Sequence, residues 1–535
     1  MQPSAANLSN PKLTPEVTPT PSPVVSPDIS GETHNHSPLK RYLIVLAFGA
    51  LIVLAWVAWT SFWDTGLYGD NVEQFVWAHR MELGYYKHPP LPTWLLGLAT
   101  SLVGSHWWLT NALAALCVMA TGILTWLIAA RLFGERTANV AIVLWSLQQS
   151  FSVSAEIYNH NTLLVLCMSA MTYAVLRALT TEFDTRWWLA SGALAACAML
   201  SKYQAALPLL ALLVVVFAVR KKPISYLAWR MALVLLVFFL LFGPHLYWGL
   251  SNQFPSLRYA SEALESGGLV RRMSWVLTFA ANQVRMVLPL LLAIAICMLL
   301  TRFNHHRSTH KLRLPVPAPV ARDFGATFNA KEVSIWMWSL VWGPVLAVLA
   351  LSLVSGSALR NHWGIQLFQF FSLWVAWRWR QHPVLGLRNL IAAALVAHSA
   401  GFIYYAVKQS DPNAALAERR ADSSYPAQRM SDAAVAHWKS LSNCPLRIVA
   451  GDFEAGLVSA YSKETPVVFT GPVATPWLSS AEITQHGALY VFDNNTALPA
   501  DVTAATRWYL SKDAAQNKKY VQFAVRLPAK ACNTV

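Results

Sequence analysis

Long apolar runs fill most of residues 42 to 406 and constrain the fold more than any other feature of this sequence. A helix needs roughly 20 apolar residues to cross a hydrocarbon core of about 30 Å, and several runs reach that length. Within a bilayer every backbone polar group must be paired inside its own segment, so these runs are expected to be helices. Only 13% of the residues are charged, against roughly 25% in ordinary soluble domains. The sequence therefore predicts a mainly α-helical, polytopic transmembrane bundle.

The apolar runs predict eleven spans, with boundaries uncertain by a few residues. The expected spans are 42–62, 107–130, 137–155, 161–180, 187–203, 204–219, 230–250, 280–301, 334–354, 364–378 and 386–407. Residues 91–104 are apolar but short and proline-led, which predicts an interfacial or re-entrant helix in the first outside loop. If residue 40 is cytoplasmic, most Lys and Arg residues of the connecting loops fall inside, as the positive-inside rule requires. An odd number of spans then sends the C-terminus outside.

The ends of the chain differ from the membrane part. Residues 1–38 are rich in Pro, Ser and Thr, so we expect a disordered cytoplasmic tail. Residues 39–407 form the expected transmembrane domain. In residues 408–535 short apolar runs alternate with helix-like stretches, which predicts a small periplasmic α/β domain. The only cysteines of this last region, Cys444 and Cys532, can form a disulfide if it lies outside the cytoplasm, and the sequence leaves that open.

The net charge of +15 does not indicate a nucleic-acid partner. The basic residues cluster in short loops between apolar runs, which is the positive-inside pattern rather than a groove for phosphates. The partner that this charge pattern indicates is the lipid bilayer.

Acidic and basic side chains gather in the longest expected outside loop, residues 63–106. They are Asp64, Asp70, Glu73, His79, Arg80, Glu82, Lys87 and His88. Charged groups at a membrane surface are costly unless they are solvated or used. Composition alone favours an ordinary solvated loop, so the order of the residues has to decide.

That order resembles the first outside loop of the GT-C superfamily of membrane glycosyltransferases. The superfamily includes the dolichyl-phosphate-mannose–protein mannosyltransferases, the aminoarabinose transferases of lipid A and the galacturonosyltransferases of lipopolysaccharide core. Here Asp70 follows the first span, and after an amphipathic stretch Gly-Tyr-Tyr-Lys-His-Pro-Pro (84–90) leads into an apolar helix. Asp70 matches the family's loop aspartate, whereas Asn71 replaces its usual Glu. Lys87 replaces an acidic residue, and His88 stands where some members place a phosphate-contacting Lys.

Further motifs follow in the family's order and cover about residues 42–380. They are Leu-Phe-Gly-Glu-Arg at 132–136, Tyr-Asn-His-Asn-Thr at 158–162, Leu-Ser-Lys-Tyr at 200–203, Pro-His-Leu-Tyr-Trp at 244–248, Leu-Arg-Tyr at 257–259 and Arg-Asn-His-Trp-Gly at 360–364. One departure is that many members carry an Asp in the second outside loop, where this chain has Asn159 and Asn161. Glu156 is the nearest acid in that loop, so the loop has no match to the family's second Asp.

The resemblance implies a sugar taken from a polyprenyl-phosphate carrier at the periplasmic face. A carboxylate must accept the proton of the acceptor hydroxyl, and Asp70 is the expected base, alone or with Glu73 or Glu156. Fixed cations must stabilise the departing phosphate. The expected ligands of the lipid phosphate and sugar are Tyr86, Lys87, His88, Asn159, Lys202, Tyr203, Arg258, His362 and Trp363. No metal ligands are assigned, although some relatives bind divalent ions, so a metal stays open.

Two other functions compete with this glycosyltransferase. A lipid-linked glycan transporter would favour internal repeats and ionisable residues near the midplane, and neither is evident. A scaffold whose outer domain does the binding would not need Asp70, Lys87 and Lys202 in the family's order. The sequence does not name the sugar, the carrier or the acceptor, which is an envelope glycan, a lipid or a protein. The expected location is the bacterial inner membrane.

Overall fold

The computed structural model describes most of the chain. The described residues are 38–181, 185–262, 267–308, 328–356, 358–359, 363–382, 386–411, 422–493, 496–497, 499–503, 505–510, 519–530 and 532. The expected N-terminal tail, apart from Pro38, and His362 lie outside these residues.

Seven helical segments of the described chain are long and apolar enough to cross a membrane. They lie in α1 (Pro38–Trp63), α4 (Trp108–Phe133), α6 (His160–Thr180), α9 (Ile224–Ser251), α11 (Leu269–Ser308), the continuous run of α12 (Ala330–Met337), η3 (Trp338–Trp342) and α13 (Gly343–Ser355), and α16 (Leu387–Gln409). The mainly helical, multi-pass architecture expected from the sequence is therefore confirmed.

The other four expected spans are shorter helices. They are α5 (Glu135–Ser146), α7 (Thr185–Ser201), α8 (Ala206–Val219) and the broken pair α14 (Gly364–Leu367) and α15 (Phe371–Arg378). The span expected at 137–155 ends as a helix at Ser146, and a 3₁₀ turn, η1 (Gln149–Phe151), follows it. A helix that packs inside the bundle need not match the thickness of the lipid, and nine of the twelve residues of α5 are buried.

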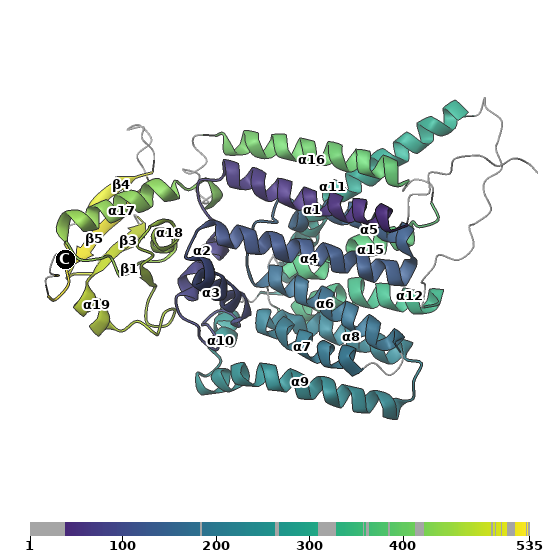
Figure 1. Ribbon diagram of the computed structural model, residues 1–535, viewed down its shortest axis with the longest axis horizontal. Helices are drawn as coiled ribbons and strands as arrows, with labels where there is room; N and C mark the ends of the chain where they lie inside the picture. Colours follow the sequence, from purple (N-terminus) through teal and green to yellow (C-terminus); the bar gives the residue numbers. More distant parts are fainter. Residues whose placement is uncertain are drawn as a thin grey trace, which may run out of the picture. The chain divides into compact units, whose positions relative to one another are not determined.

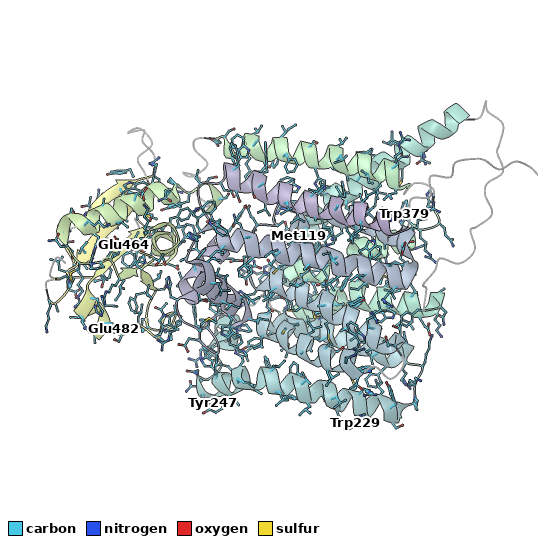
Figure 2. All side chains as sticks on the ribbon, in the orientation of Figure 1. Met119, Trp229, Tyr247, Trp379, Glu464 and Glu482 are labelled. Atoms are coloured by element: carbon cyan, nitrogen blue, oxygen red, sulfur yellow. A yellow bond between two sulfur atoms is a disulfide. The ribbon has the colours of Figure 1, made fainter. Side chains whose placement is uncertain are left out.

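The central helices pack side by side, with α6 against α4 and α7, and α7 against α9 (Figure 1). Gly192 of α7 permits the closest of these approaches, because a Cβ atom there would lie 2.5 Å from the carbonyl oxygen of Val234 in α9. On the outer side of α9, Trp229 and Tyr247 lie toward opposite ends of the helix (Figure 2). Both are exposed, as are Leu236 and Leu240 between them, which is typical of a lipid-facing surface with aromatic ends.

Two helices lie in the segment between α1 and α4, α2 (Gly69–Ala78) and α3 (Leu91–Val103). The helix predicted at 91–104 is thus present as α3. It begins after the rigid Pro89-Pro90 pair and ends at Gly104, whose φ of +85° suits glycine. A further short helix, α10 (Pro255–Glu262), follows α9.

The C-terminal region is a five-stranded sheet with helices, as predicted (Figure 1). Its strands are β1 (Ile448–Ala450), β2 (Val467–Phe469), β3 (Ala488–Asp493), β4 (Thr506–Tyr509) and β5 (Tyr520–Arg526), in the order β2-β1-β3-β5-β4. Strand β1 is parallel to β2 and β3, whereas β5 is antiparallel to β3 and β4. Helices α17 (Ala427–Leu441), α18 (Phe453–Tyr461) and α19 (Ser480–His486) complete it. Strand β4 was not predicted, because its four residues are mostly exposed and carry no apolar run.

Helix α18 of the C-terminal domain packs against α2. Gly456 lets the helix approach α2 so closely that a Cβ atom would lie 2.3 Å from a methyl carbon of Val72. The imidazole Nε2 of His79 lies 2.8 Å from the Ser459 hydroxyl, and the Asp422 carboxylate accepts a hydrogen bond from the Gly69 amide at 2.9 Å. The domain therefore supports the helix that carries Asp70 and Glu73.

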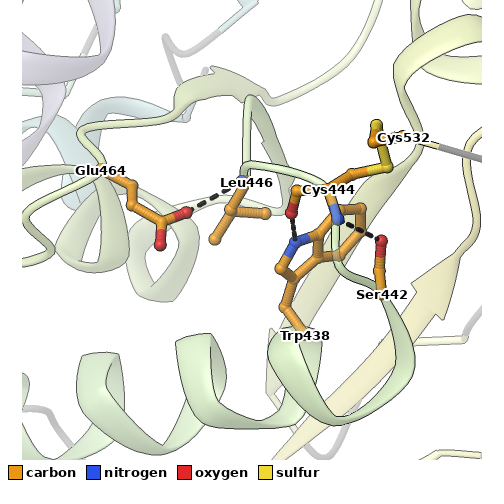
Figure 3. The surroundings of a disulfide bond; sticks show 6 residues. All are labelled: Trp438, Ser442, Cys444, Leu446, Glu464 and Cys532. Carbon is orange, nitrogen blue, oxygen red and sulfur yellow. Dashed lines mark hydrogen bonds between the residues drawn. A yellow bond between two sulfur atoms is a disulfide. The ribbon is translucent and has the colours of Figure 1, made fainter. Parts of the chain in front are cut away.

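A disulfide joins Cys444 and Cys532 near the end of the domain (Figure 3). The carbonyl oxygen of Cys444 accepts a hydrogen bond from the Trp438 indole at 2.7 Å, and the Glu464 carboxylate accepts one from the Leu446 amide at 2.8 Å. The bridge spans 88 residues of sequence and so closes the part of the domain that holds all five strands into one loop.

Removing this disulfide is expected to destabilise the domain strongly. A bridge over so long a loop restricts the unfolded chain, and losing a native disulfide typically costs about 2–5 kcal/mol. The double variant Cys444→Ser/Cys532→Ser should expose the domain to limited proteolysis under conditions in which the wild type resists. The variant Cys197→Ser, which removes a free cysteine, is the control. Equal protease resistance of the double variant and the wild type would contradict this prediction.

Candidate functional site

A cavity of about 800 Å³ gathers polar side chains from helices and loops that lie far apart in the sequence. Its polar walls come from α2, the loop before α3, the start of α6, the α7–α8 junction and α10. The residues with polar side chains in these walls are Asp70, Glu73, Lys87, His88, Asn159, His160, Asn161, Lys202, Tyr203, Gln204, Ser256 and Tyr259. Leu207, Val348, Leu351 and Leu359 form an apolar wall in the same cavity. Leu351 of α13 is 58% exposed, so the apolar wall includes a side chain that the rest of the protein does not cover.

Asp70 stands in the first turn of α2 with its side chain exposed to the cavity. The Asn159 amide donates a hydrogen bond to the Asp70 carboxylate at 2.8 Å. Asn159 is also the N-cap of α6, and its oxygen accepts from the backbone amides of Asn161 and Thr162 at 2.8 and 3.1 Å. Because capping uses the oxygen, only the NH₂ group can face Asp70. Asn159 therefore orients the Asp70 side chain.

Asn71 anchors the same turn in the protein interior. Its NH₂ group lies 3.1–3.2 Å from acceptors on Thr110, Asn111 and the Glu156 backbone, and its oxygen accepts from the Tyr158 amide at 3.0 Å. The residue is fully buried. Asn71, which stands where the resembled family usually has Glu, thus makes structural hydrogen bonds next to Asp70.

Glu73 lies three residues after Asp70, on the same face of α2, and forms an ion pair with Lys87. The Lys87 ammonium also lies over the rings of Tyr86 and Tyr259, at 5.3 and 5.6 Å from their centroids. Burial alone would lower the pKa of Lys87, but the adjacent Glu73 carboxylate outweighs burial and holds the pKa above its usual value. Lys87 is therefore a permanent cation at this wall.

Lys202 provides a second cation at the junction of α7 and α8. Only 9% of the residue is exposed, and its ammonium donates a hydrogen bond to the Asn161 side-chain oxygen at 2.7 Å. Nearby, the rings of His88 and His160 lie 4.0 Å apart, centroid to centroid. His160 is buried, and its Nε2 atom has no hydrogen-bond partner within the described part of the chain. The cavity thus holds two cations and two imidazoles in addition to Asp70.

Most of the site residues expected from the sequence line this one cavity. Those that line it are Asp70, Glu73, Lys87, His88, Asn159, Lys202, Tyr203 and Trp363. Tyr86 stands just behind the wall, with its ring 5.8 Å from that of Tyr259. Arg258 is exposed and donates instead to the Gln253 side chain at 3.0 Å.

Two cavity-lining residues that helical periodicity would have indicated were not selected from the sequence. Ser256 and Tyr259 lie three residues apart on α10 and both line the cavity, whereas the charged Arg258 between them does not. Side chains at i and i+3 share one face of a helix, so Arg258 was chosen for its charge against the geometry of the helix. His160 was also not selected. Its signal in the sequence is a polar residue at the start of an otherwise apolar helix.

Glu156 does not line this cavity, so the structure gives no support to the role in catalysis expected for it. Its buried carboxyl interacts with that of Asp64. Asp64 accepts a hydrogen bond from the Tyr405 hydroxyl at 2.6 Å. Burial, and then repulsion by Asp64, hold the pKa of Glu156 well above its usual value, and burial raises the pKa of Asp64 to about 6. The two acids form a buried pair that ties the end of α1 to α16.

Replacing Glu156 by Gln is expected to stabilise the protein at neutral pH without abolishing its activity. Folding raises the pKa of this acid above its value of about 4 in the unfolded chain. The free energy of unfolding therefore falls as the pH rises from the pKa of the unfolded state through that of the folded state. Gln does not titrate, so the variant avoids this loss. The melting temperature of Glu156→Gln should exceed that of the wild type by about 2 °C or more at pH 7.5, and the difference should shrink toward pH 5. A lower melting temperature at both pH values would contradict this account.

A second, smaller cavity of about 270 Å³ shares Asp70 and Asn159 with the first. Its other polar lining residues include Tyr68, Ser150, Ser154 and Asp422, the last from the segment that leads into the C-terminal domain. Asp70 therefore borders two separate spaces.

The described residues hold no group of three or more His, Cys, Asp or Glu side chains arranged to bind a metal ion. The ionisable groups that line the main cavity include two carboxylates, two ammonium groups and two imidazoles. Together they can accept a proton and bind an anion.

Comparison with known proteins gives related results from sequence and structure. Residues 87–248 match the family model for dolichyl-phosphate-mannose-protein mannosyltransferase. The lipid A galacturonosyltransferase RgtD of Rhizobium johnstonii is 24% identical over 327 residues, which is 58% of this chain and 67% of that protein.

The solved structures of ArnT from Cupriavidus metallidurans share the fold. The structure bound to undecaprenyl phosphate aligns with a TM-score of 0.55 at 14% identity and covers 92% of this chain and 100% of that one. The apo structure aligns with a TM-score of 0.52 at 16% identity, over 91% and 98% of the two chains.

Proposed function

We propose that this chain, a multi-pass membrane glycosyltransferase with the GT-C fold, moves a sugar from a polyprenyl-phosphate carrier to a cell-envelope acceptor at the periplasmic face. The observation that carries this proposal is the composition of the main cavity. One side holds Asp70, Lys87 and Lys202, and the other is apolar and includes the exposed Leu351 of α13. A phosphate with a sugar on one side and a polyprenyl tail on the other needs both surfaces.

The proposed reaction exchanges one C–O bond for another. Asp70 accepts the proton from the acceptor hydroxyl as its oxygen attacks the anomeric carbon of the sugar. The bond from that carbon to the phosphate oxygen breaks, and its electron pair stays with the phosphate. The phosphate thereby gains a second negative charge, which Lys87 and Lys202 stabilise in a site with little water. A metal is not needed for any of these steps.

The acceptor enters from the second cavity in this proposal, because that cavity and the donor cavity meet at Asp70. The similar protein RgtD is a lipid A galacturonosyltransferase, so lipid A is the first acceptor to test here. We further propose that the C-terminal domain is periplasmic. The disulfide between Cys444 and Cys532 supports that side, since disulfides persist outside the reducing cytoplasm.

Purified protein should transfer sugar from at least one of a panel of undecaprenyl-phosphate sugars to lipid A or an envelope extract. Release of undecaprenyl phosphate must match the sugar transferred. Reconstituted vesicles provide the comparison with a transporter. Movement of the donor across the membrane without any transfer, from every donor tested, would replace the transferase by the lipid-linked glycan transporter.

A further inference from the structure

Tyr203 and Ser256 form a hydrogen-bonded edge of the main cavity that the mechanism above does not use. The Tyr203 hydroxyl oxygen lies 2.7 Å from Nε2 of His245 and 3.2 Å from the Ser256 hydroxyl. Tyr203 and Ser256 both line the cavity, whereas His245 lies behind them and is 2% exposed. Tyr203 comes from the α7–α8 junction, Ser256 from α10 and His245 from α9, so three parts of the fold meet here.

The position of the proton on His245 follows from its partners. Its Nδ1 atom lies 2.7 Å from the backbone oxygen of Leu83, and a carbonyl oxygen can only accept a hydrogen bond. Nδ1 therefore carries the hydrogen. The ring packs against the rings of Phe242 and Trp248, and in the part of the chain that the structure describes no carboxylate pairs with it. A buried imidazole without a counter-charge is neutral, so its Nε2 atom carries a lone pair.

This tautomer sets the direction of the remaining hydrogen bonds. Because Nε2 accepts, the Tyr203 hydroxyl must donate its only hydrogen to His245. The Tyr203 oxygen then accepts from Ser256, which uses the only hydrogen of the serine hydroxyl. Both oxygens at this edge are left with lone pairs alone, so the edge accepts hydrogen bonds and donates none. It cannot bind a phosphate oxygen, but it suits a hydroxyl or ammonium group.

The next residue gives independent support for a polar ligand at this edge. Gln204 lines the same cavity, and both polar atoms of its side-chain amide are buried without a hydrogen-bond partner among the described residues. Buried polar atoms in folded proteins are nearly always paired, so an unpaired amide beside a cavity indicates groups that a ligand supplies. The cations Lys87 and Lys202 serve the phosphate elsewhere in the same cavity, which leaves this edge for the sugar.

We propose that the Tyr203 and Ser256 oxygens, held as hydrogen-bond acceptors by His245, bind a hydroxyl or ammonium group of the donor's sugar and thereby help to select that sugar. The inference rests on the proposed transferase function. His245 is a positioning residue in it, because it acts only through Tyr203.

Kinetics with matched donors test this proposal. The donors are the undecaprenyl-phosphate sugar that the wild type uses and analogues that each lack one hydroxyl or amino group. Tyr203→Phe should lose about 5- to 10-fold in kcat/KM with the parent donor, the loss expected for one neutral hydrogen bond, and nothing with the analogue that lacks the bound group. Ser256→Ala should follow the same pattern, and Ser256→Thr should restore the wild-type preference. The analogue that escapes the loss also distinguishes a hydroxyl from an ammonium group.

Two controls separate this role from a structural one. Binding of undecaprenyl phosphate, which has no sugar, should be unchanged in Tyr203→Phe. Tyr247→Phe, on the exposed side of α9, should match the wild type with every donor. An equal loss by Tyr203→Phe on all donors, no loss on any, or a parallel loss of undecaprenyl phosphate binding would overturn the inference.

Failure of the proposed function would look different. If the wild type transfers no sugar, dissociation constants for the same donors decide the inference. Weaker binding by Tyr203→Phe only for donors that carry the selected group supports a sugar-binding edge in a protein that is not a transferase. Equal binding of every donor by both proteins, or no binding of any sugar-bearing donor, overturns it.

Discussion

Replacing Asp70 by Asn is expected to lower kcat for sugar transfer by about 10²- to 10⁴-fold, the range typical of losing a general base. Asn has nearly the same shape as Asp but cannot accept the proton of the acceptor hydroxyl. The cationic wall of the cavity is untouched, so affinity for undecaprenyl phosphate should change little. Rates of product formation, with the dissociation constant and melting temperature measured on the same preparations, check this expectation.

Asp432→Asn is the matched control for this change. Asp432 is exposed on α17 in the C-terminal domain and accepts a hydrogen bond from Gln428 at 2.8 Å, so its loss should leave transfer unchanged. If Asp70→Asn keeps most of the wild-type rate, Asp70 is not the base. Glu73 would then be the candidate, because it lies on the same face of α2 and lines the same cavity.

The fold was predictable because membrane helices are specified by apolar length, a local property of the sequence. α3 was predicted by its apolar run and its leading prolines. The length of an apolar run does not predict where a helix ends when that helix is buried inside the protein. α5 stops at Ser146, nine residues before the end of the expected span, and neighbouring helices rather than lipid surround it. β4 was missed because it is an exposed strand that depends on its pairing with β5.

The site was predictable only in part, for a different reason. The order of motifs predicted Asp70, Lys87 and Lys202, which line one cavity, but not which groups face one another. Asn159 was read as the loss of an acid, yet its double role as helix cap and donor to Asp70 depends on contact between α2 and α6. Glu156 was chosen for its charge, and its pairing with Asp64 brings together residues 92 positions apart. Pairings at such distances leave no local pattern in a single sequence.

Replacing Lys202 by Met is expected to weaken binding of undecaprenyl phosphate by about 10- to 100-fold, because a charge-assisted hydrogen bond contributes about 1.5–3 kcal/mol. Met keeps the length and apolar stem of Lys, so the buried position stays filled while the ammonium and its bond to Asn161 are lost. Binding assays on the variant, with Lys439→Met on the exposed side of α17 as control, measure the effect.

The comparison with Asp70→Asn separates the two roles assigned to this cavity. Loss of the base should affect kcat and spare phosphate binding, whereas loss of Lys202 should impair phosphate binding and kcat/KM together. A Lys202→Met protein that binds undecaprenyl phosphate as tightly as the wild type would leave Lys202 a purely structural lysine. The phosphate would then depend on Lys87 and the His88–His160 pair, which line the same cavity.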